Sequence, residues 1–172
     1  MTASAASARS LTATDSATAD AIAAGRTSIG IELGSTRIKA CLIGEDHEVL
    51  ATGGHGWENQ FEDRIWTYSL ESVWSGLGQA VAALLDDVQE RYGVRPTTVG
   101  AIGISAMMHG YLAFDEADDL LVPFRTWRNT TTGAAASELT EALGYNIPMR
   151  WTAAPLYQAV LDSLVANRES GE

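Results

Sequence analysis

The sequence predicts an α/β fold, and three features of the 172 residues point to it. Three β-prone runs follow one another near residues 28–33, 38–44 and 47–53. Apolar residues at helical spacing then extend from about residue 69 to 92. A further apolar run covers residues 99–105, and helical patterns return after it. Antiparallel strands followed by a helix, a strand and a helix are typical of an α/β arrangement.

The first two runs form a predicted hairpin over residues 28–43, with the sequence SIGIELGSTRIKACLI. The first run ends at Glu32, a turn of small residues occupies positions 34–36, and Lys39 lies in the second run. A tight turn with hydroxyl side chains can bind phosphate, because exposed N–H groups converge on an anion. Carboxylate oxygens suit Mg²⁺, so Glu32 is a candidate metal ligand. On these residues alone, an ordinary hairpin with an exposed glutamate is an equally good interpretation.

Glycine and serine residues mark the expected ends of the next elements. The third strand is expected to end where glycines cluster at 53–56, and residues 57–67 are expected to form an aromatic, polar loop. Ser69 is a candidate N-cap for the long helix, and Gly93 is suited to end it. The run 99–105 is apolar at most positions, which predicts a strand buried on both faces in the middle of a sheet.

The last third of the chain predicts a hairpin and two helices. Residues 111–115 and 120–127 flank an acidic turn, which is typical of a hairpin. A small-residue helix is expected from 132 to 143, closed by Gly144. Pro155 is suited to open a final helix that extends through residue 165, because proline is tolerated at the first helical position.

Composition divides the chain into a tail, a domain and a short end. Alanine, serine and threonine make up 19 of the first 27 residues, so residues 1–27 are expected to be a disordered tail. The polar residues 167–172 are expected to be frayed. The folded domain is therefore predicted to extend from residue 28 to 166.

Charge and residue usage restrict the function classes. The formal net charge of −11 argues against nucleic-acid binding, which needs a basic surface. No run of 18 apolar residues occurs, so no membrane span is expected. Cys41 is the single cysteine, which excludes a disulfide within the chain. The cytoplasm is the expected compartment.

Three segments in the same order resemble the FGGY carbohydrate kinases: the hairpin, the Met-His-Gly after the apolar run, and the segment FRTWRNT. The resemblance extends from about residue 28 to 162. It implies a partial ribonuclease-H-like domain of the actin-like ATPase kind, with a mixed sheet and flanking helices. It also implies carbohydrate metabolism, with phosphoryl transfer from ATP and Mg²⁺ to a sugar hydroxyl.

The resemblance assigns the hairpin to the nucleotide. Gly34, Ser35 and Thr36 match the turn that faces the phosphates, and Lys39 matches a basic position after that turn. Glu32 stands where the family usually has an aspartate that handles Mg²⁺, so a contact through water is expected.

The two later segments are assigned to a sugar or polyol substrate. Met108, His109 and Gly110 resemble the Met-His-Gly of the xylulokinase branch, which lies against the sugar. The other sugar-binding candidates are Trp127, Arg128 and Asn129, where that branch has Trp-Asn-Asp; the different order leaves the identity of the sugar open. Ordinary structural roles for the histidine and the tryptophan are the alternatives.

The family's general base is an aspartate beyond the matched region, and its adenosine pocket lies mostly in a second domain. We therefore expect the first part of a kinase, inactive alone, with no catalytic residue and without its C-terminal domain. A surface meant for that domain is expected to promote self-association into homo-oligomers. A non-catalytic module that binds sugar or a protein partner is the alternative. A nuclease with this fold would need several clustered carboxylates, and only Glu32 is suitably placed.

Overall fold

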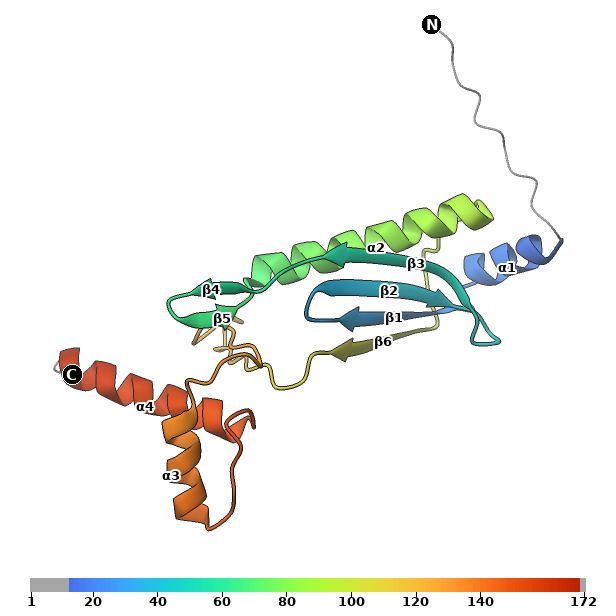
Figure 1. Ribbon diagram of the computed structural model, residues 1–172. Helices are drawn as coiled ribbons and strands as arrows, with labels where there is room; N and C mark the ends of the chain where they lie inside the picture. Colours follow the sequence, from blue (N-terminus) through green and yellow to red (C-terminus); the bar gives the residue numbers. More distant parts are fainter. Residues whose placement is uncertain (1–12, 171–172) are drawn as a thin grey trace, which may run out of the picture. The chain divides into compact units, whose positions relative to one another are not determined.

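A computed structural model describes residues 13–170, which fall into two compact units (Figure 1). The first unit contains the described residues up to Trp57 together with Trp74–Ala106. The second contains Glu58–Val73 and the described residues from Met107 onward. Each unit is described by itself below.

The first unit is built on a mixed four-stranded sheet of β1 (Ser28–Leu33), β2 (Arg37–Ile43), β3 (Val49–Gly56) and β6 (Ala101–Ala106). The strand order is β3-β2-β1-β6. The three sequential strands pair antiparallel, whereas β1 and β6 are parallel. The predicted α/β class with a mixed sheet and flanking helices is confirmed.

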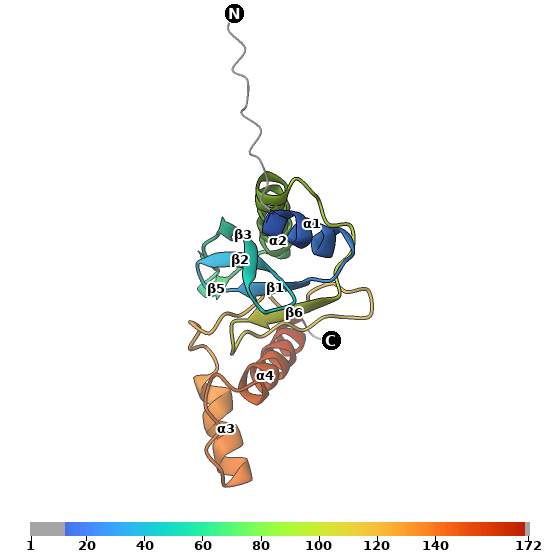
Figure 2. The ribbon, with the colours of Figure 1, turned by 90° about the vertical axis from the view of Figure 1, so that its right-hand side faces the viewer.

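Two helices, α1 (Ala13–Ala23) and α2 (Leu70–Tyr92), lie on the same face of this sheet (Figure 2). The core between helices and sheet contains the fully buried side chains of Ile22, Leu42, Leu84 and Val88. The prediction of a disordered tail is wrong for residues 13–23, because Ile22 gives α1 an apolar anchor in this core. The rest of that prediction up to residue 12 lies outside the described residues.

Strand β3 continues through the glycine cluster that was expected to end it. A Cβ atom at Gly53 would overlap the backbone of Ala80 and Leu84 in α2. The glycine therefore lets the helix lie directly on the strand. Gly76 in α2 has a similar role, since a Cβ there would lie 2.9 Å from Ile38 Cδ1. These glycines are sites of close packing between helix and sheet.

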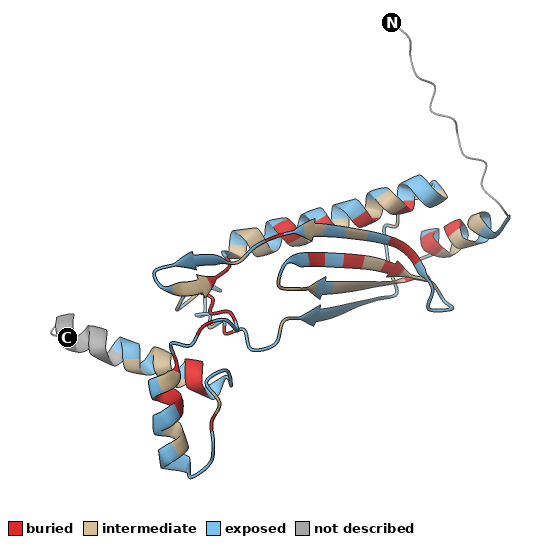
Figure 3. Cartoon of the chain, viewed as in Figure 1, coloured by how far each residue is buried: buried red, intermediate tan, exposed pale blue. Residues whose placement is uncertain are grey.

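Strand β6 lies at an edge of the four-stranded sheet, and the expectation of a central, buried strand is wrong. Ile102 and Ile104 are 59% and 70% exposed. Figure 3 shows β6 in the colour of exposed residues. They are in register with Ile29 and Ile31 of β1, which pack against the helices. The apolar alternation was thus interpreted correctly as a strand, but the helix layer does not cover this edge.

Both ends of α2 agree with their predicted caps. The Ser72 N–H donates a hydrogen bond to Ser69 Oγ over 3.1 Å, which is the expected N-cap geometry. Gly93 has φ +70°, the left-handed conformation that favours glycine after a helix.

The second unit contains the hairpin of β4 (Gln60–Glu62) and β5 (Ile65–Thr67), where a loop was expected. Asp63 and Arg64 join these strands with φ of 46° and 67°. Two consecutive positive φ values are typical of the two-residue turns that close hairpins. Neither residue is a glycine or an asparagine, so the sequence carried only a weak turn signal.

The same unit contains the helices α3 (Gly133–Leu143) and α4 (Ala153–Ser170). Gly144 ends α3 with φ +63°, as predicted. Helix α4 begins two residues before Pro155 and continues to Ser170, so the expected frayed end is helical up to that residue. The last two residues of the predicted frayed end lie outside the described residues.

The segment 111–127 forms the expected antiparallel pairing only as two isolated bridges, Tyr111 with Arg125 and Phe114 with Leu120. Asp115 Oδ1 accepts hydrogen bonds from the N–H groups of Ala117 and Asp119, over 2.8 and 3.0 Å. This carboxylate therefore stabilises the acidic turn. Among the described helices, none combines the length and the hydropathy that a membrane crossing requires.

Candidate functional site

The turn between β1 and β2 is held in place by Trp57. Gly34 N–H donates to Arg37 O over 3.0 Å, and Gly34 O accepts a 2.7 Å hydrogen bond from the indole Nε1 of Trp57. The backbone N–H of Trp57 donates to Thr36 O over 3.1 Å. A Cβ at position 34 would lie 2.9 Å from Arg37 O, so the close approach needs glycine. The turn is thus a fixed feature of the sheet end.

Glu32 and Lys39 face each other directly across the β1–β2 ladder. Lys39 Nζ lies 3.0 Å from Glu32 Oε2, and the two side chains are 59% and 51% exposed. An exposed pair of this kind contributes only about 0–1 kcal/mol to stability. Both charged groups therefore remain available to a ligand at low cost.

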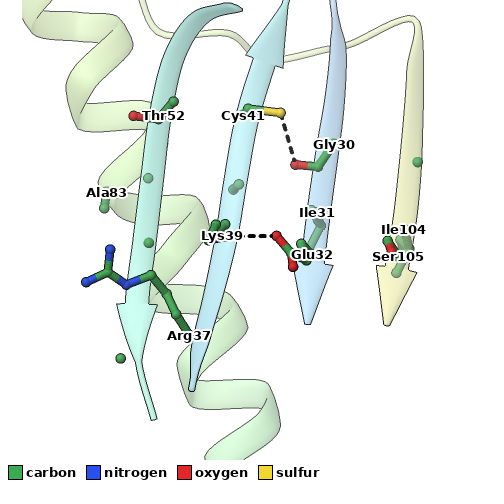
Figure 4. A pocket seen from close by; sticks show the side chains of 15 residues that line it. Gly30, Ile31, Glu32, Arg37, Lys39, Cys41, Thr52, Ala83, Ile104 and Ser105 are labelled. Carbon is green, nitrogen blue, oxygen red and sulfur yellow. Dashed lines mark hydrogen bonds and ion pairs between the residues drawn. The ribbon is translucent and has the colours of Figure 1, made fainter. Parts of the chain in front are cut away.

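These charges lie in a concave region of about 990 Å³ on the sheet (Figure 4). Every strand of the sheet contributes to its lining, and the polar and small members include Gly30, Glu32, Lys39, Gly54 and Ser105. In Figure 4, Lys39 and Glu32 point toward each other, and Cys41 Sγ points to Gly30 O at 3.7 Å. Glycines of β1, β3 and β6 leave much of this space open, and its bulky lining residues include Ile31, Arg37 and Ile104.

The residues around the turn fit the Mg²⁺-bound nucleotide that the family implies. Glu32 offers an exposed carboxylate, and a Cβ at Gly34 would lie only 3.5 Å from its Oε1. Mg²⁺ is usually held by one or two carboxylates together with phosphates and waters. Glu32 could supply one such carboxylate.

In the second unit, the Met-His-Gly segment is an exposed turn. Met108 is 74% exposed, and His109 has φ +64°, a conformation uncommon for a residue with a side chain. A Cβ at Gly110 would lie 3.1 Å from Phe124 Cε2, so this glycine allows the turn to pack on an aromatic ring. His109 lines a pocket of about 450 Å³ together with Arg150 and Trp151.

The segment 127–129 combines one exposed and one stacked side chain with a buried amide. Trp127 is 41% exposed. The Arg128 guanidinium lies 3.6 Å from the centroid of the Trp66 ring and donates to Asn59 Oδ1 over 2.8 Å. Trp127 is thus the partly exposed aromatic member, and the guanidinium carbon of Arg150 lies 5.9 Å from the centroid of its ring.

Asn129 is buried, and its amide is engaged with the protein backbone. Oδ1 accepts from Trp66 N–H over 2.8 Å, and Nδ2 donates to Trp66 O over 2.8 Å and to Thr126 O over 3.0 Å. This side chain therefore fixes β5 to the loop that carries Trp127 and Arg128.

The surroundings of Tyr68 in the second unit shift the pKa of its hydroxyl. Burial raises the pKa of the Tyr68 hydroxyl, while its hydrogen bond with Asn59 and the nearby Arg128 charge lower that pKa by less. The tyrosine is therefore neutral at physiological pH and serves as a buried, hydrogen-bonded support.

Sequence reasoning missed two basic residues near His109. Arg125 is buried, and Arg150 donates from Nε to Trp127 O over 3.0 Å. Both residues, together with His109, line a small space next to the 450 Å³ pocket. Arg125 belongs to the segment FRTWRNT, but its burial and its place beside Arg150 depend on the folded chain and give no periodic signal in the sequence.

The chain was compared with known families and structures. Residues 27–158 match the FGGY family of carbohydrate kinases, N-terminal domain, which confirms the resemblance seen in the sequence. A search of curated protein sequences found no significant match.

Among solved structures, a xyloylose kinase from Brucella ovis matches with a TM-score of 0.65 and 22% identity over 76% of this chain and 28% of that chain. The xylulose kinase from Rhodospirillum rubrum gives a TM-score of 0.63 and 20% identity, with the same two coverages of 76% and 28%. The glycerol kinase from Plasmodium falciparum, solved with ADP, gives 0.67 and 11% over 84% and 31%. The chain thus spans less than a third of the length of these kinases, and the likeness concerns the fold.

Proposed function

This chain belongs to the FGGY family of carbohydrate kinases through its N-terminal domain, and from that membership we propose that it forms part of an ATP-dependent carbohydrate kinase. The reaction is transfer of a phosphoryl group from MgATP to a hydroxyl of a sugar or polyol. The observation that carries this proposal is the family match over residues 27–158, supported by the fixed turn that Glu32 and Lys39 flank.

In this proposal the turn binds phosphate. Ser35 and Thr36 contribute hydroxyl and backbone donors, and Lys39 contributes a charge-assisted hydrogen bond. When Lys39 turns to a phosphate oxygen, it leaves Glu32 free to bind Mg²⁺ through water, and the exchange is cheap because the pair is exposed. Mg²⁺ in such enzymes neutralises charge on the phosphate oxygens.

The exposed segments of the second unit bind the sugar in this proposal. Trp127 offers an indole face for the apolar face of a sugar, and the His109 imidazole can donate to or accept from a hydroxyl. Met108 and Gly110 border that histidine, while Arg128 offers its guanidinium nitrogens. Asn129 positions the loop that carries Trp127 and Arg128 and does not contact the sugar itself, since its amide is already bonded to backbone.

No residue of this chain is assigned as the general base. Asp115 accepts hydrogen bonds from the turn that it caps, and Asp162 forms an ion pair with Arg125. We therefore expect the chain alone to bind substrate without appreciable turnover.

Titration of the full chain with pentoses, hexoses and polyols, followed by tryptophan fluorescence, tests the sugar site. At least one compound should change the emission. The change should be smaller in Trp127→Phe, where only Trp151 in the pocket beside His109 still reports binding, and it should be unaltered in Trp74→Phe, whose exposed indole lies on α2 in the first unit. No response to any compound would overturn the sugar site.

Two further measurements address the nucleotide and the reaction. MgATP should bind to the full chain, and Lys39→Met should weaken that binding by about tenfold, the loss of roughly one charge-assisted hydrogen bond. Sugar binding with no MgATP binding would favour the non-catalytic sugar-binding module. Rapid ATP-dependent phosphorylation by the chain alone would overturn the expectation that its base is supplied elsewhere.

A further inference from the structure

Arg125 is a buried cation with most of its hydrogen-bonding capacity unused. Its residue is only 7% exposed, and Nη2 lies 3.2 Å from Asp162 Oδ2. The Nε and Nη1 atoms are both buried, and neither has a hydrogen-bond partner within the described part of the chain. A guanidinium carries five N–H donors, and buried donors without acceptors are rare in folded proteins.

Asp162 does not complete the pairing of this arginine. Its side chain is 53% exposed, and its other oxygen, Oδ1, accepts from Gln158 Nε2 over 2.8 Å. The contact to Arg125 is therefore single rather than the two parallel hydrogen bonds that an arginine and a carboxylate can form. The unused donors still need a negatively charged or strongly polar acceptor.

The neighbouring polar side chains do not supply that acceptor. Arg125 shares a small space with His109, Asn129, Thr132 and Arg150. Thr132 Oγ1 donates to Met149 O over 2.6 Å, and the amide of Asn129 is bonded to backbone. Arg150 adds a second positive charge at the same place. The environment therefore favours an anion that comes from outside the chain.

The size of the space restricts the form of that anion. The space is about 10 Å³, which admits about one small atom such as a water or one carboxylate oxygen. It shares His109 and Arg150 with the larger pocket of about 450 Å³, which is also lined by Trp151 and Thr152. A ligand fits both spaces if its terminal group puts a single oxygen into the narrow one and its polar chain lies in the wider one.

We propose that Arg125 and Arg150 bind the terminal carboxylate of the substrate, so that the preferred substrate is a polyhydroxylated acid rather than a neutral sugar. This inference rests on the proposed function, because the larger pocket is lined by the sugar-binding candidate His109. One carboxylate oxygen can enter the narrow space beside Arg125, while the second oxygen stays in the wider pocket that Arg150 also lines. A neutral hydroxyl in the same place would give the unused N–H donors of Arg125 an uncharged and therefore weaker acceptor.

A matched pair of ligands tests the preference. D-Gluconate and D-glucitol have the same six-carbon chain and differ in whether the terminal group is a carboxylate or an alcohol. Binding of each to the full chain is measured by calorimetry at fixed ionic strength. Gluconate should bind at least tenfold more tightly than glucitol, and the difference should shrink as salt is added.

Two variants should shift the affinity for gluconate in opposite directions, and a folding defect common to both could not produce that result. Arg125→Met should abolish the preference for the acid. Asp162→Asn removes the competing carboxylate, and it should raise the affinity for gluconate several-fold while leaving glucitol unchanged. Arg95→Met removes an exposed charge on the first unit and should retain the preference of the unmodified chain.

The outcomes distinguish failure of the carboxylate site from failure of sugar binding as a whole. Equal affinity for gluconate and glucitol, or a preference that survives Arg125→Met, would overturn the carboxylate site while leaving a sugar site in place. Binding of neither gluconate nor glucitol, nor of any neutral sugar, would overturn the carboxylate site together with the proposed sugar binding.

Discussion

The indole N–H of Trp57 donates a 2.7 Å hydrogen bond to the carbonyl oxygen of Gly34. Trp57 follows the last residue of β3, and Gly34 follows the last residue of β1. The contact therefore ties the end of one strand to the turn that we propose to bind phosphate. Since Trp57 is buried, this polar contact is shielded from water and fixes the direction of the turn.

Replacement of Trp57 by phenylalanine should loosen this turn. Phenylalanine has no N–H, so Gly34 O loses its donor in a shielded place, at a cost of about 1–3 kcal/mol. Urea unfolding measures the loss. Trp74→Phe is the control, because Trp74 is exposed on α2 and should change stability by less than about 0.5 kcal/mol. Equal losses of stability in the two variants would show that this hydrogen bond does not stabilise the fold.

Two glycines of β3 should respond oppositely to alanine. Gly53→Ala places a methyl group into the backbone of α2 at Ala80 and Leu84, and we expect a loss of about 3 kcal/mol or more. Gly56→Ala has no atom within 4 Å of its added Cβ. It should be neutral or stabilising by up to about 1 kcal/mol, because it restricts the unfolded chain. Thermal unfolding of both variants checks the difference, and a tolerated Gly53→Ala would contradict the close helix approach.

Asp87 connects α2 with the outer edge of the sheet. Its Oδ2 accepts a hydrogen bond from Thr52 N–H over 2.9 Å, and its Oδ1 accepts one from Arg91 Nε over 2.7 Å. Partial burial raises the pKa of this carboxyl, but the hydrogen bonds from Arg91 and Thr52 outweigh burial and hold the pKa below its usual range. The charged form is thus favoured by folding.

This lowered pKa predicts an acid-dependent contribution to stability. A carboxyl whose pKa is lower in the folded state stabilises the fold above its unfolded pKa of about 4, and that contribution disappears as the pH falls through the folded value. The stability difference between the unmodified chain and Asp87→Asn should therefore be largest near pH 7 and shrink below about pH 4. Asp86→Asn removes the exposed pair with Arg95 and is the control, with an expected change in stability of less than about 1 kcal/mol at pH 7. A constant Asp87→Asn effect across the range would argue against the linkage.

Asn129 should matter for stability more than any exposed asparagine. Asn129→Ala removes three hydrogen bonds to Trp66 and Thr126 and leaves backbone groups without partners, at a cost of about 3 kcal/mol. Asn146→Ala is the matched control, since Asn146 is exposed before Ile147, and it should change stability by less than about 0.5 kcal/mol. Similar unfolding midpoints for the two variants would show that the amide does not fix the loop.

Local chemistry was enough to predict most elements of the fold. The β-branched runs of the first hairpin, the Ser69 cap and the left-handed glycines at 93 and 144 act within a few residues of themselves. Such signals are encoded locally, so they are visible without any knowledge of tertiary contacts. The same holds for the family motifs, whose order along the chain was sufficient to indicate the carbohydrate kinases.

Errors occurred where a distant contact determines the outcome. Gly53 resembles a strand breaker until α2 lies upon it, and α1 resembles a disordered tail until Ile22 enters the core. Strand β6 resembles a central strand because its sequence is apolar, while its exposure depends on how far the helix layer extends. In each case the deciding partner lies on another element of the fold.

The sequence by itself determined the α/β class, the hairpin of β1 and β2 and the membership of a kinase family. Those properties follow from local propensity and from motif order. Only the tertiary structure decided that Trp57 holds the turn, that Asn129 supports its loop and that Arg125 is buried with unused donors. These roles depend on which groups exclude water and which remain without partners, and burial is a property of the assembled fold.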